Sequence, residues 1–221
     1  MFLQRIAYLY DCMFYAGISV LVVLYAILHA ACLLSAKSLT PKISDPESIW
    51  FLSAMCFQHG MSFLEFWWAS HGSFQQWWND ERFWWISNAS CFLLGTLEAF
   101  FISIGLLETG FSVTPKSSET DNASPYEITA SPLFISLVML VMMFSVATVT
   151  AAALVINGGT ESFNYMCGEL LCGMWSLVIL YPILSQLLKV RKGIDKVPLS
   201  VMLPSVIGTI VFCVMVNTYI F

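Results

Sequence analysis

The sequence predicts an all-α integral membrane protein with about five transmembrane helices, amphipathic interfacial helices and one long polar loop. Of the 221 residues, 58% are hydrophobic and 10% are charged, whereas a soluble domain carries about 25% charged residues. Apolar runs recur at the length of about 20 residues that crosses a bilayer. The net charge of −5 and the lack of a basic tract argue against a nucleic-acid partner. Residues 1–221 therefore form a single membrane domain in this prediction.

The first crossing is predicted at residues 12–34, after an interfacial lead-in at residues 1–11. This run is too long for the apolar region of a signal peptide, so no cleavable leader is expected. His29 lies near the end of the run and is interpreted as an interfacial histidine.

Residues 48–67 form the second predicted crossing, after a loop that contains Pro41 and Pro46. His59 and Glu65 lie within it. An ionisable side chain at membrane depth is costly unless it faces protein or water. Both side chains are therefore expected to face the interior of a bundle, either in a structural hydrogen-bonded role or as the lining of a polar conduit.

Six of the eight tryptophans lie between Trp67 and Trp85. At 100° per residue, four of them share an arc of about 120°: Trp77, Trp78, Trp84 and Trp85. Arg82 lies off this arc, Glu81 intrudes on it, and the Asp80-Glu81 pair is interpreted as a solvated helix face. Indole favours the headgroup layer, so residues 73–107 are predicted to be interfacial helices. An aromatic belt at a helix end would lie at the same depth.

Residues 86–107 are long enough to cross the bilayer, and the distribution of positive charge bears on whether they do. With a cytosolic N-terminus and no crossing here, seven Lys and Arg residues are cytosolic and two are outside. If residues 86–107 cross, two Lys and Arg residues are cytosolic and seven are outside. An external N-terminus inverts each count, so seven cytosolic residues also result from six crossings that start outside. The seven are Arg5, Arg82, Lys116, Lys189, Arg191, Lys192 and Lys196, and the two are Lys37 and Lys42.

A polar loop is predicted at residues 108–131, and a loop of this length without secondary structure is usually functional or disordered. Three further crossings follow at residues 133–156, 170–188 and 199–221. The turn at residues 157–161 is expected outside, as are Glu161 and Glu169. The seven cysteines lack the spacing of a metal site and are interpreted as small buried hydrophobic residues. No metal site is predicted.

Two motifs carry a resemblance to a known family: Trp77-Trp78-Asn79-Asp80-Glu81-Arg82-Phe83-Trp84 and, after it, Phe111-Ser112-Val113-Thr114-Pro115-Lys116. With Pro41-Lys42-Ile43-Ser44, Ser48-Ile49-Trp50-Phe51 and Leu180-Tyr181-Pro182 in register, nearly the whole chain resembles the C-terminal membrane region of plant cellulose synthases and cellulose synthase-like proteins. These are processive inverting glycosyltransferases of family 2. They polymerise a sugar from a UDP-sugar at the cytosolic face and thread the glycan through their own membrane channel.

The resemblance implies specific roles for residues of this chain. Phe111, Val113, Thr114 and Lys116 would bind substrate in a cytosolic gating loop, because they match the family's Phe-x-Val-Thr-x-Lys motif. The interfacial helix would carry Trp77, Trp78, Arg82, Trp84 and Trp85, with His59 and Glu65 as channel-facing candidates. The resemblance also selects a cytosolic N-terminus and a location in the Golgi, another endomembrane or the plasma membrane. Expected partners are membrane lipid, a UDP-sugar and a nascent glycan; a homo-oligomer is left open.

The chain departs from the family where catalysis is concerned. It lacks the family's metal-binding and UDP-binding aspartates, its catalytic Thr-Glu-Asp motif and its Gln-x-x-Arg-Trp motif. No catalytic residue or cofactor is therefore predicted in this chain, and the family's Mg²⁺ or Mn²⁺ would belong to a missing domain. The chain is expected to be inactive alone, as a fragment or a truncated paralogue. Two alternatives are a related enzyme that glycosylates a small lipophilic acceptor such as a triterpenoid, and a non-enzymatic membrane channel or scaffold.

Overall fold

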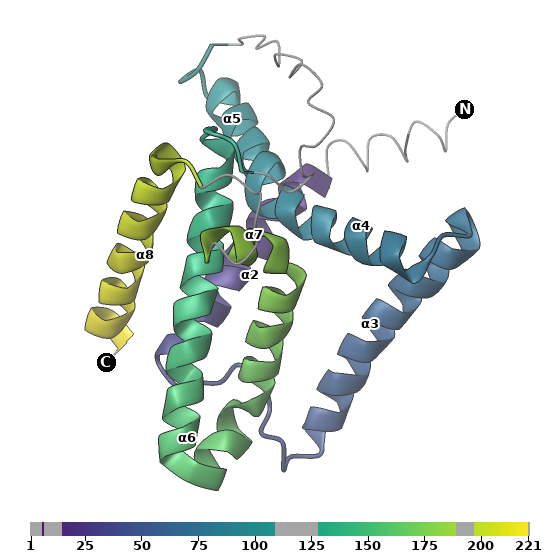
Figure 1. Ribbon diagram of the computed structural model, residues 1–221, viewed down its shortest axis with the longest axis vertical. Coiled ribbons are helices and arrows are strands. Elements are labelled where there is room, and N and C mark those ends of the chain that lie inside the picture. Colours follow the sequence, from purple (N-terminus) through teal and green to yellow (C-terminus); the bar gives the residue numbers. More distant parts are fainter. Residues whose placement is uncertain (1–5, 7–14, 109–127, 189–196, 221) are drawn as a thin grey trace.

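A computed structural model of the chain describes residue 6 and residues 15–108, 128–188 and 197–220 (Figure 1). The regular secondary structure in these segments is helical throughout, which confirms the all-helical prediction. In chain order the elements are α2 (Tyr15–Leu34), α3 (Glu47–Ser70), α4 (Phe74–Ser87), the π-helix η2 (Asn88–Phe92), α5 (Leu93–Ser103), α6 (Leu133–Ile179), α7 (Tyr181–Leu187) and α8 (Leu199–Ile220).

Four helical segments in this part of the chain are long and apolar enough to cross a membrane. They are Ala16–Leu34, Phe74–Ser103, Leu133–Ile179 and Leu199–Tyr219. Helix α3 is not among them, because Gln58, His59 and Glu65 lower its mean hydropathy. Its 24 residues would nevertheless span about 36 Å at 1.5 Å per residue, which exceeds the hydrocarbon thickness of about 30 Å.

Helix α6 is a helical hairpin that reverses direction at Gly159. The backbone of Gly159 has φ 71° and ψ −156°, a conformation that essentially only glycine adopts. A Cβ atom added there would meet nothing within 4 Å, so the backbone conformation rather than crowding requires glycine. In Figure 1 the two arms, residues 133–158 and 160–179, lie side by side, and the second arm leads back to α7.

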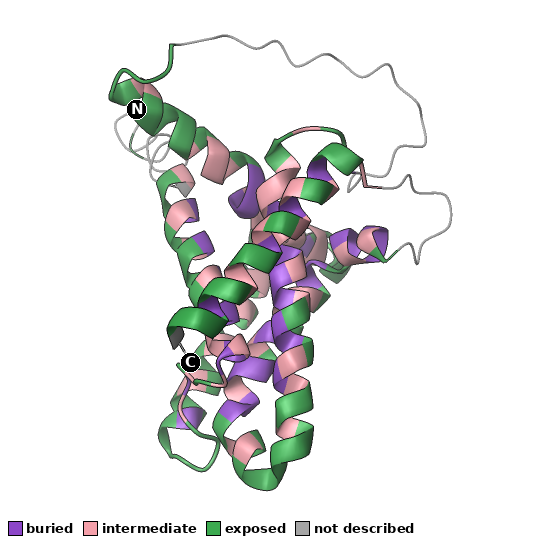
Figure 2. Ribbon diagram, turned by 90° about the vertical axis from the view of Figure 1, so that its left-hand side faces the viewer, coloured by how far each residue is buried: buried purple, intermediate pink, exposed green. Residues whose placement is uncertain are grey.

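The first arm of α6 is the centre of the bundle and packs against α2 and α8. Leu137, Val141 and Ala147 on this arm are fully buried, as are Ala30 and Leu33 on α2. Buried residues gather where these helices meet in Figure 2, whereas the outer faces are exposed. Exposed apolar side chains are expected on a protein whose outer surface faces lipid rather than water.

Helix α3 stands apart from this bundle (Figure 1). Ser48 is the only buried residue among its 24 residues. Its C-terminal end packs against α4, and the loop before its N-terminal end is bound to α6. There the backbone N–H of Ile43 donates to the carbonyl of Asn164 (3.1 Å), and the side chain of Asn164 donates to Ser44 Oγ (2.9 Å). Helix α3 is thus fixed at both ends, and most of its length between them is not buried against the bundle.

The π-helix η2 joins α4 to α5 and anchors both to α6. Asn88 is 1% exposed, and its side-chain amide donates to the carbonyl of Trp84 (2.8 Å). The hydroxyl of Ser136 on α6 donates to the carbonyl of Ala89 (2.6 Å), which the irregular helix leaves accessible. In Figure 1, α4 runs across the axis of α6. Helix α5 packs against α2, where the hydroxyl of Thr96 donates to the carbonyl of Ala16 (2.8 Å).

Candidate functional site

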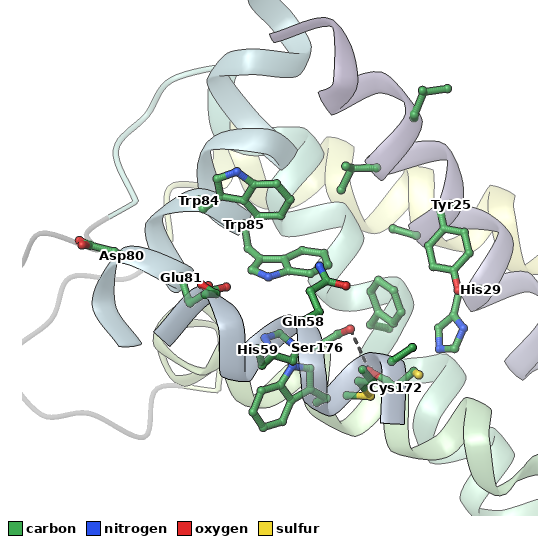
Figure 3. Close-up of a pocket in the computed structure, with 18 of the residues that line it drawn as sticks. Tyr25, His29, Gln58, His59, Asp80, Glu81, Trp84, Trp85, Cys172 and Ser176 are labelled. Atoms are coloured by element: carbon green, nitrogen blue, oxygen red, sulfur yellow. Dashed lines mark hydrogen bonds between the residues drawn. The ribbon is translucent and has the colours of Figure 1, made fainter. Parts of the chain in front are cut away.

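A cavity of about 860 Å³ lies between α3 and the bundle, within the range of about 300–1,000 Å³ that is typical of ligand pockets. Four helices line it (Figure 3). Apolar and aromatic side chains dominate, and a smaller number of polar groups face the same space. The polar and aromatic lining includes Tyr25 and His29 of α2, Gln58, His59 and Ser62 of α3, Glu81, Trp84 and Trp85 of α4, and Cys172, Trp175 and Ser176 of α6.

The tryptophan arc of α4 faces this cavity and the helices around it. Trp77, Trp84 and Trp85 line the cavity, and Trp84 and Trp85 meet edge to face with ring centroids 5.4 Å apart. Trp78 packs edge to face against Trp175 of α6, at 5.6 Å. The guanidinium of Arg82 lies 5.1 Å from the centroid of the Trp78 ring, in cation–π geometry. The arc therefore presents its indoles to other helices of the protein.

His59 and Glu65, the two channel-facing candidates, lie on different faces of α3. His59 lines the cavity, and its Nε2 accepts a hydrogen bond from the indole N–H of Trp175 (3.1 Å). This bond joins α3 to the second arm of α6. Glu65 is exposed and does not line the cavity. It follows His59 by six residues, which places it about 240° further around the helix at 100° per residue.

A hydrogen-bond chain links α3 and α4 at the wall of the cavity. The indole N–H of Trp77 donates to Ser62 Oγ (3.1 Å), and the hydroxyl of Ser62 donates to Glu81 Oε1 (2.5 Å). Glu81 was interpreted from the sequence as part of a solvated face, but it is half-buried and lines the cavity. Its intrusion on the tryptophan arc was the signal that could have identified it.

A buried pair of ionisable residues lies at another end of the cavity. His29 Nδ1 is 2.5 Å from Glu169 Oε2, and the two side chains are 4% and 0% exposed. Glu169 Oε1 accepts the backbone N–H groups of Leu39 (2.7 Å) and Thr40 (2.9 Å). The sequence analysis places Glu169 outside the membrane and His29 at the interface, and it does not predict that they pair. The structure buries both within the protein, where they join the loop after α2 to the second arm of α6.

The remaining predicted site residues, Phe111, Val113, Thr114 and Lys116, lie outside the described residues. Within the residues that are described, no group of three or more His, Cys, Asp or Glu side chains is placed to hold a metal ion. The described cysteines are unpaired thiols. The cavity is therefore suited to non-covalent binding of a ligand that has apolar faces and hydroxyl or amide groups.

Comparison with known proteins shows which family the sequence of this chain matches. The family model described as cellulose synthase matches residues 1–220. The probable cellulose synthase A catalytic subunit 2 (UDP-forming) of Oryza sativa subsp. indica is 31% identical over 197 residues, which cover 85% of this chain and 17% of that protein. The cellulose synthase A catalytic subunit 3 (UDP-forming) of Arabidopsis thaliana is 30% identical over 189 residues, 85% of this chain and 18% of that protein. No solved structure gives a significant match.

Proposed function

Because this chain belongs to the cellulose synthase family, we propose that it forms the membrane conduit of a UDP-sugar-dependent glycosyltransferase and guides a growing β-linked glycan. The conduit is the cavity between α2, α3, α4 and α6. The chain spans only 17–18% of the length of these relatives. Sugar transfer itself is therefore assigned to other parts of such an enzyme.

The composition of the cavity wall is the observation that carries this proposal. A pyranose ring has C–H groups on its faces and hydroxyl groups around its edge, so its binding site needs flat apolar surfaces beside hydrogen-bonding groups. The indoles of Trp84, Trp85 and Trp175 supply the surfaces. Gln58 and Glu81 supply amide and carboxylate groups in the same space. This is the pattern of an apolar pocket with a few polar groups that orient a ligand.

In the proposed arrangement the chain crosses the membrane five times, through α2, α3, the two arms of α6 and α8. Helices α4 and α5 would lie along the cytosolic face, with the N-terminus also cytosolic. The oblique course of α4 in Figure 1 and the reversal at Gly159 support this arrangement. Modification of Asn122 by the lumenal glycosylation machinery in microsomes would contradict it, because that residue belongs to the proposed cytosolic loop.

The nucleotide-sugar partner and its metal ion are proposed to interact mainly with regions outside this chain. The described residues do not fit a catalytic Mg²⁺ or Mn²⁺, because they offer no cluster of carboxylate or histidine ligands. Phe111, Val113, Thr114 and Lys116 keep their proposed role in a gating loop, through the resemblance of their motif to that of the family. The proposed location is the Golgi, another endomembrane or the plasma membrane.

A small lipophilic acceptor is the second candidate ligand. The side of the cavity formed by α2 and α3 is largely apolar and includes Leu21, Val22, Phe51, Met55 and Phe66. A triterpenoid body would fit such a surface, and its hydroxyl group would reach the polar side chains of α4. The enzyme would then glycosylate this acceptor and would extrude no polymer.

Binding of a defined oligosaccharide tests the proposed function. We expect the 221-residue chain in lipid nanodiscs to bind cellopentaose saturably, with a change in tryptophan fluorescence because four indoles line the cavity. Maltopentaose has the same composition but α-linkages, and it should bind more weakly. Absence of cellopentaose binding, together with saturable binding of a triterpenoid sapogenin, would contradict the glycan conduit and favour the second candidate.

A further inference from the structure

Glu81 is a carboxylate fixed at the cavity wall by its neighbours. Its Oε1 accepts the hydroxyl proton of Ser62 (2.5 Å). The same Ser62 oxygen accepts the indole N–H of Trp77 (3.1 Å), and Trp77 is 6% exposed. Because the indole N–H occupies an acceptor position on Ser62, the Ser62 hydroxyl is oriented as a donor to Glu81. The carboxylate is thus held by Ser62, which the buried indole of Trp77 orients.

The second oxygen of this carboxylate is available to a ligand. Glu81 Oε2 has no hydrogen-bond partner among the described residues. In Figure 3 the Glu81 carboxylate points toward the side of the cavity where Gln58 and Trp85 lie, whereas the neighbouring Asp80 carboxylate points away. Glu81 is half-buried at the wall of this largely apolar cavity. A carboxylate withdrawn from water is costly unless a polar partner solvates it, so this oxygen is a candidate for contact with a ligand.

The surroundings of Glu81 match a saccharide better than a cation. Trp84 and Trp85 follow it by three and four residues, so all three side chains lie on one face of α4. No group of three metal-ligating side chains exists in the described parts of the chain, and a hard cation requires several oxygen ligands. One carboxylate beside two indoles instead suits a neutral ligand that has hydroxyl donors and an apolar face.

We propose that Glu81 is a saccharide-binding residue whose Oε2 accepts a hydrogen bond from a hydroxyl group of a pyranose ring that packs against Trp84 and Trp85. This inference rests on the proposed function and assigns a specific contact within it. Ser62 and Trp77 are positioning residues. Ser62 donates to the carboxylate and Trp77 donates to Ser62, and neither of these two hydrogen bonds involves the sugar. The ligand class is a β-linked glucan, represented here by cellopentaose.

Substitution of Glu81 by glutamine tests the inference in the nanodisc binding assay. Glu81→Gln keeps an oxygen that accepts from Ser62 but removes the charge, and hydrogen bonds to charged groups are roughly twice as strong as neutral ones. We expect Glu81→Gln to weaken cellopentaose binding about fivefold to tenfold, which corresponds to about 1–1.4 kcal/mol. Glu98→Gln is the matched control. It makes the same chemical change at an exposed position on α5 that does not line the cavity, and binding should stay unchanged.

The positioning role of Ser62 is tested by a pair of substitutions. Ser62→Ala should weaken cellopentaose binding about twofold to fivefold, because the Glu81 carboxylate loses the hydrogen bond that orients it. Ser62→Thr retains the hydroxyl and should restore the affinity. If Glu81→Gln lowers the unfolding temperature of the chain, the comparison of Ser62→Ala with Ser62→Thr tests the role of Glu81 in its place.

The outcomes separate the inference from the proposed function. If the wild-type chain binds cellopentaose and both Glu81→Gln and Ser62→Ala bind it equally well, the role of Glu81 is wrong and the conduit stands. Equal weakening by Glu81→Gln and Glu98→Gln would also overturn it, because net charge rather than the specific contact would then set the affinity. If the wild-type chain binds no cellopentaose, the proposed function itself fails.

Discussion

Replacement of Glu169 by leucine is expected to lower the free energy of unfolding of the chain in detergent micelles by about 3–5 kcal/mol. Glu169 is fully buried. Its carboxylate pairs with His29 and accepts hydrogen bonds from the backbone N–H groups of Leu39 and Thr40. Leucine removes the acceptor for all three donors at once. A buried donor that has no acceptor destabilises the folded protein by the full free-energy cost of its desolvation. Unfolding in increasing concentrations of sodium dodecyl sulfate, followed by circular dichroism, measures the change.

Two further variants control this experiment. Glu161→Leu removes a carboxylate from an exposed position on the same hairpin, near the turn, and should have little effect. The double variant His29→Leu with Glu169→Leu should recover part of the loss, because it removes both members of the buried pair and leaves no uncompensated ionisable group. If Glu169→Leu and Glu161→Leu are equally mild, the carboxylate does not fasten the loop after α2 to α6.

Replacement of Trp77 by alanine is expected to be comparably severe, at about 3–5 kcal/mol. Trp77 is 6% exposed. The centroid of its ring lies 5.4 Å from that of Phe63 and 5.2 Å from that of Phe74. Its N–H also donates to Ser62. Since only Ser48 of α3 is buried, this aromatic cluster provides much of what holds α3 to α4. Alanine would leave a cavity there and release one end of α3.

The same unfolding measurement tests the Trp77 prediction. Trp68→Ala is the matched control, because Trp68 is 86% exposed on α3 and should tolerate the change. Trp77→Phe keeps most of the packing but loses the hydrogen bond to Ser62, so its cost should be closer to about 1 kcal/mol. Equal losses for Trp77→Ala and Trp68→Ala would mean that the cluster does not join the two helices.

The helical character of the chain could be predicted from the sequence because it follows from local composition. Long apolar runs in lipid must satisfy their backbone hydrogen bonds internally, which favours helices. Gly159 falls within the turn expected at residues 157–161, and the Gly-Gly pair there is a local signal for a break. The family could also be identified, because its motifs are local patterns in a fixed order.

The site could be predicted only in part, because its contacts join residues distant in sequence. Glu169 lies 2.5 Å from His29, which is 140 positions earlier in the chain, so no local pattern could show that they pair. Glu81 was interpreted with Asp80 as part of a solvated helix face, but it is half-buried and accepts a hydrogen bond from Ser62 on another helix. His59 pairs with Trp175, a tryptophan outside the predicted cluster. Periodicity identifies the face of one helix but not the helix that it meets.

Access of water-soluble reagents to Cys172 with and without saccharide tests the glycan conduit most directly. Cys172 lines the cavity, and Cys56 on α3 is exposed but does not line it. The experiment uses two variants in which Cys172 or Cys56 is the single remaining cysteine. We expect a charged methanethiosulfonate reagent to modify Cys172, and we expect saturating cellopentaose to slow this reaction. The rate of modification at Cys56 should stay unchanged. If Cys172 reacts at the same rate with and without cellopentaose, the cavity does not hold the glycan.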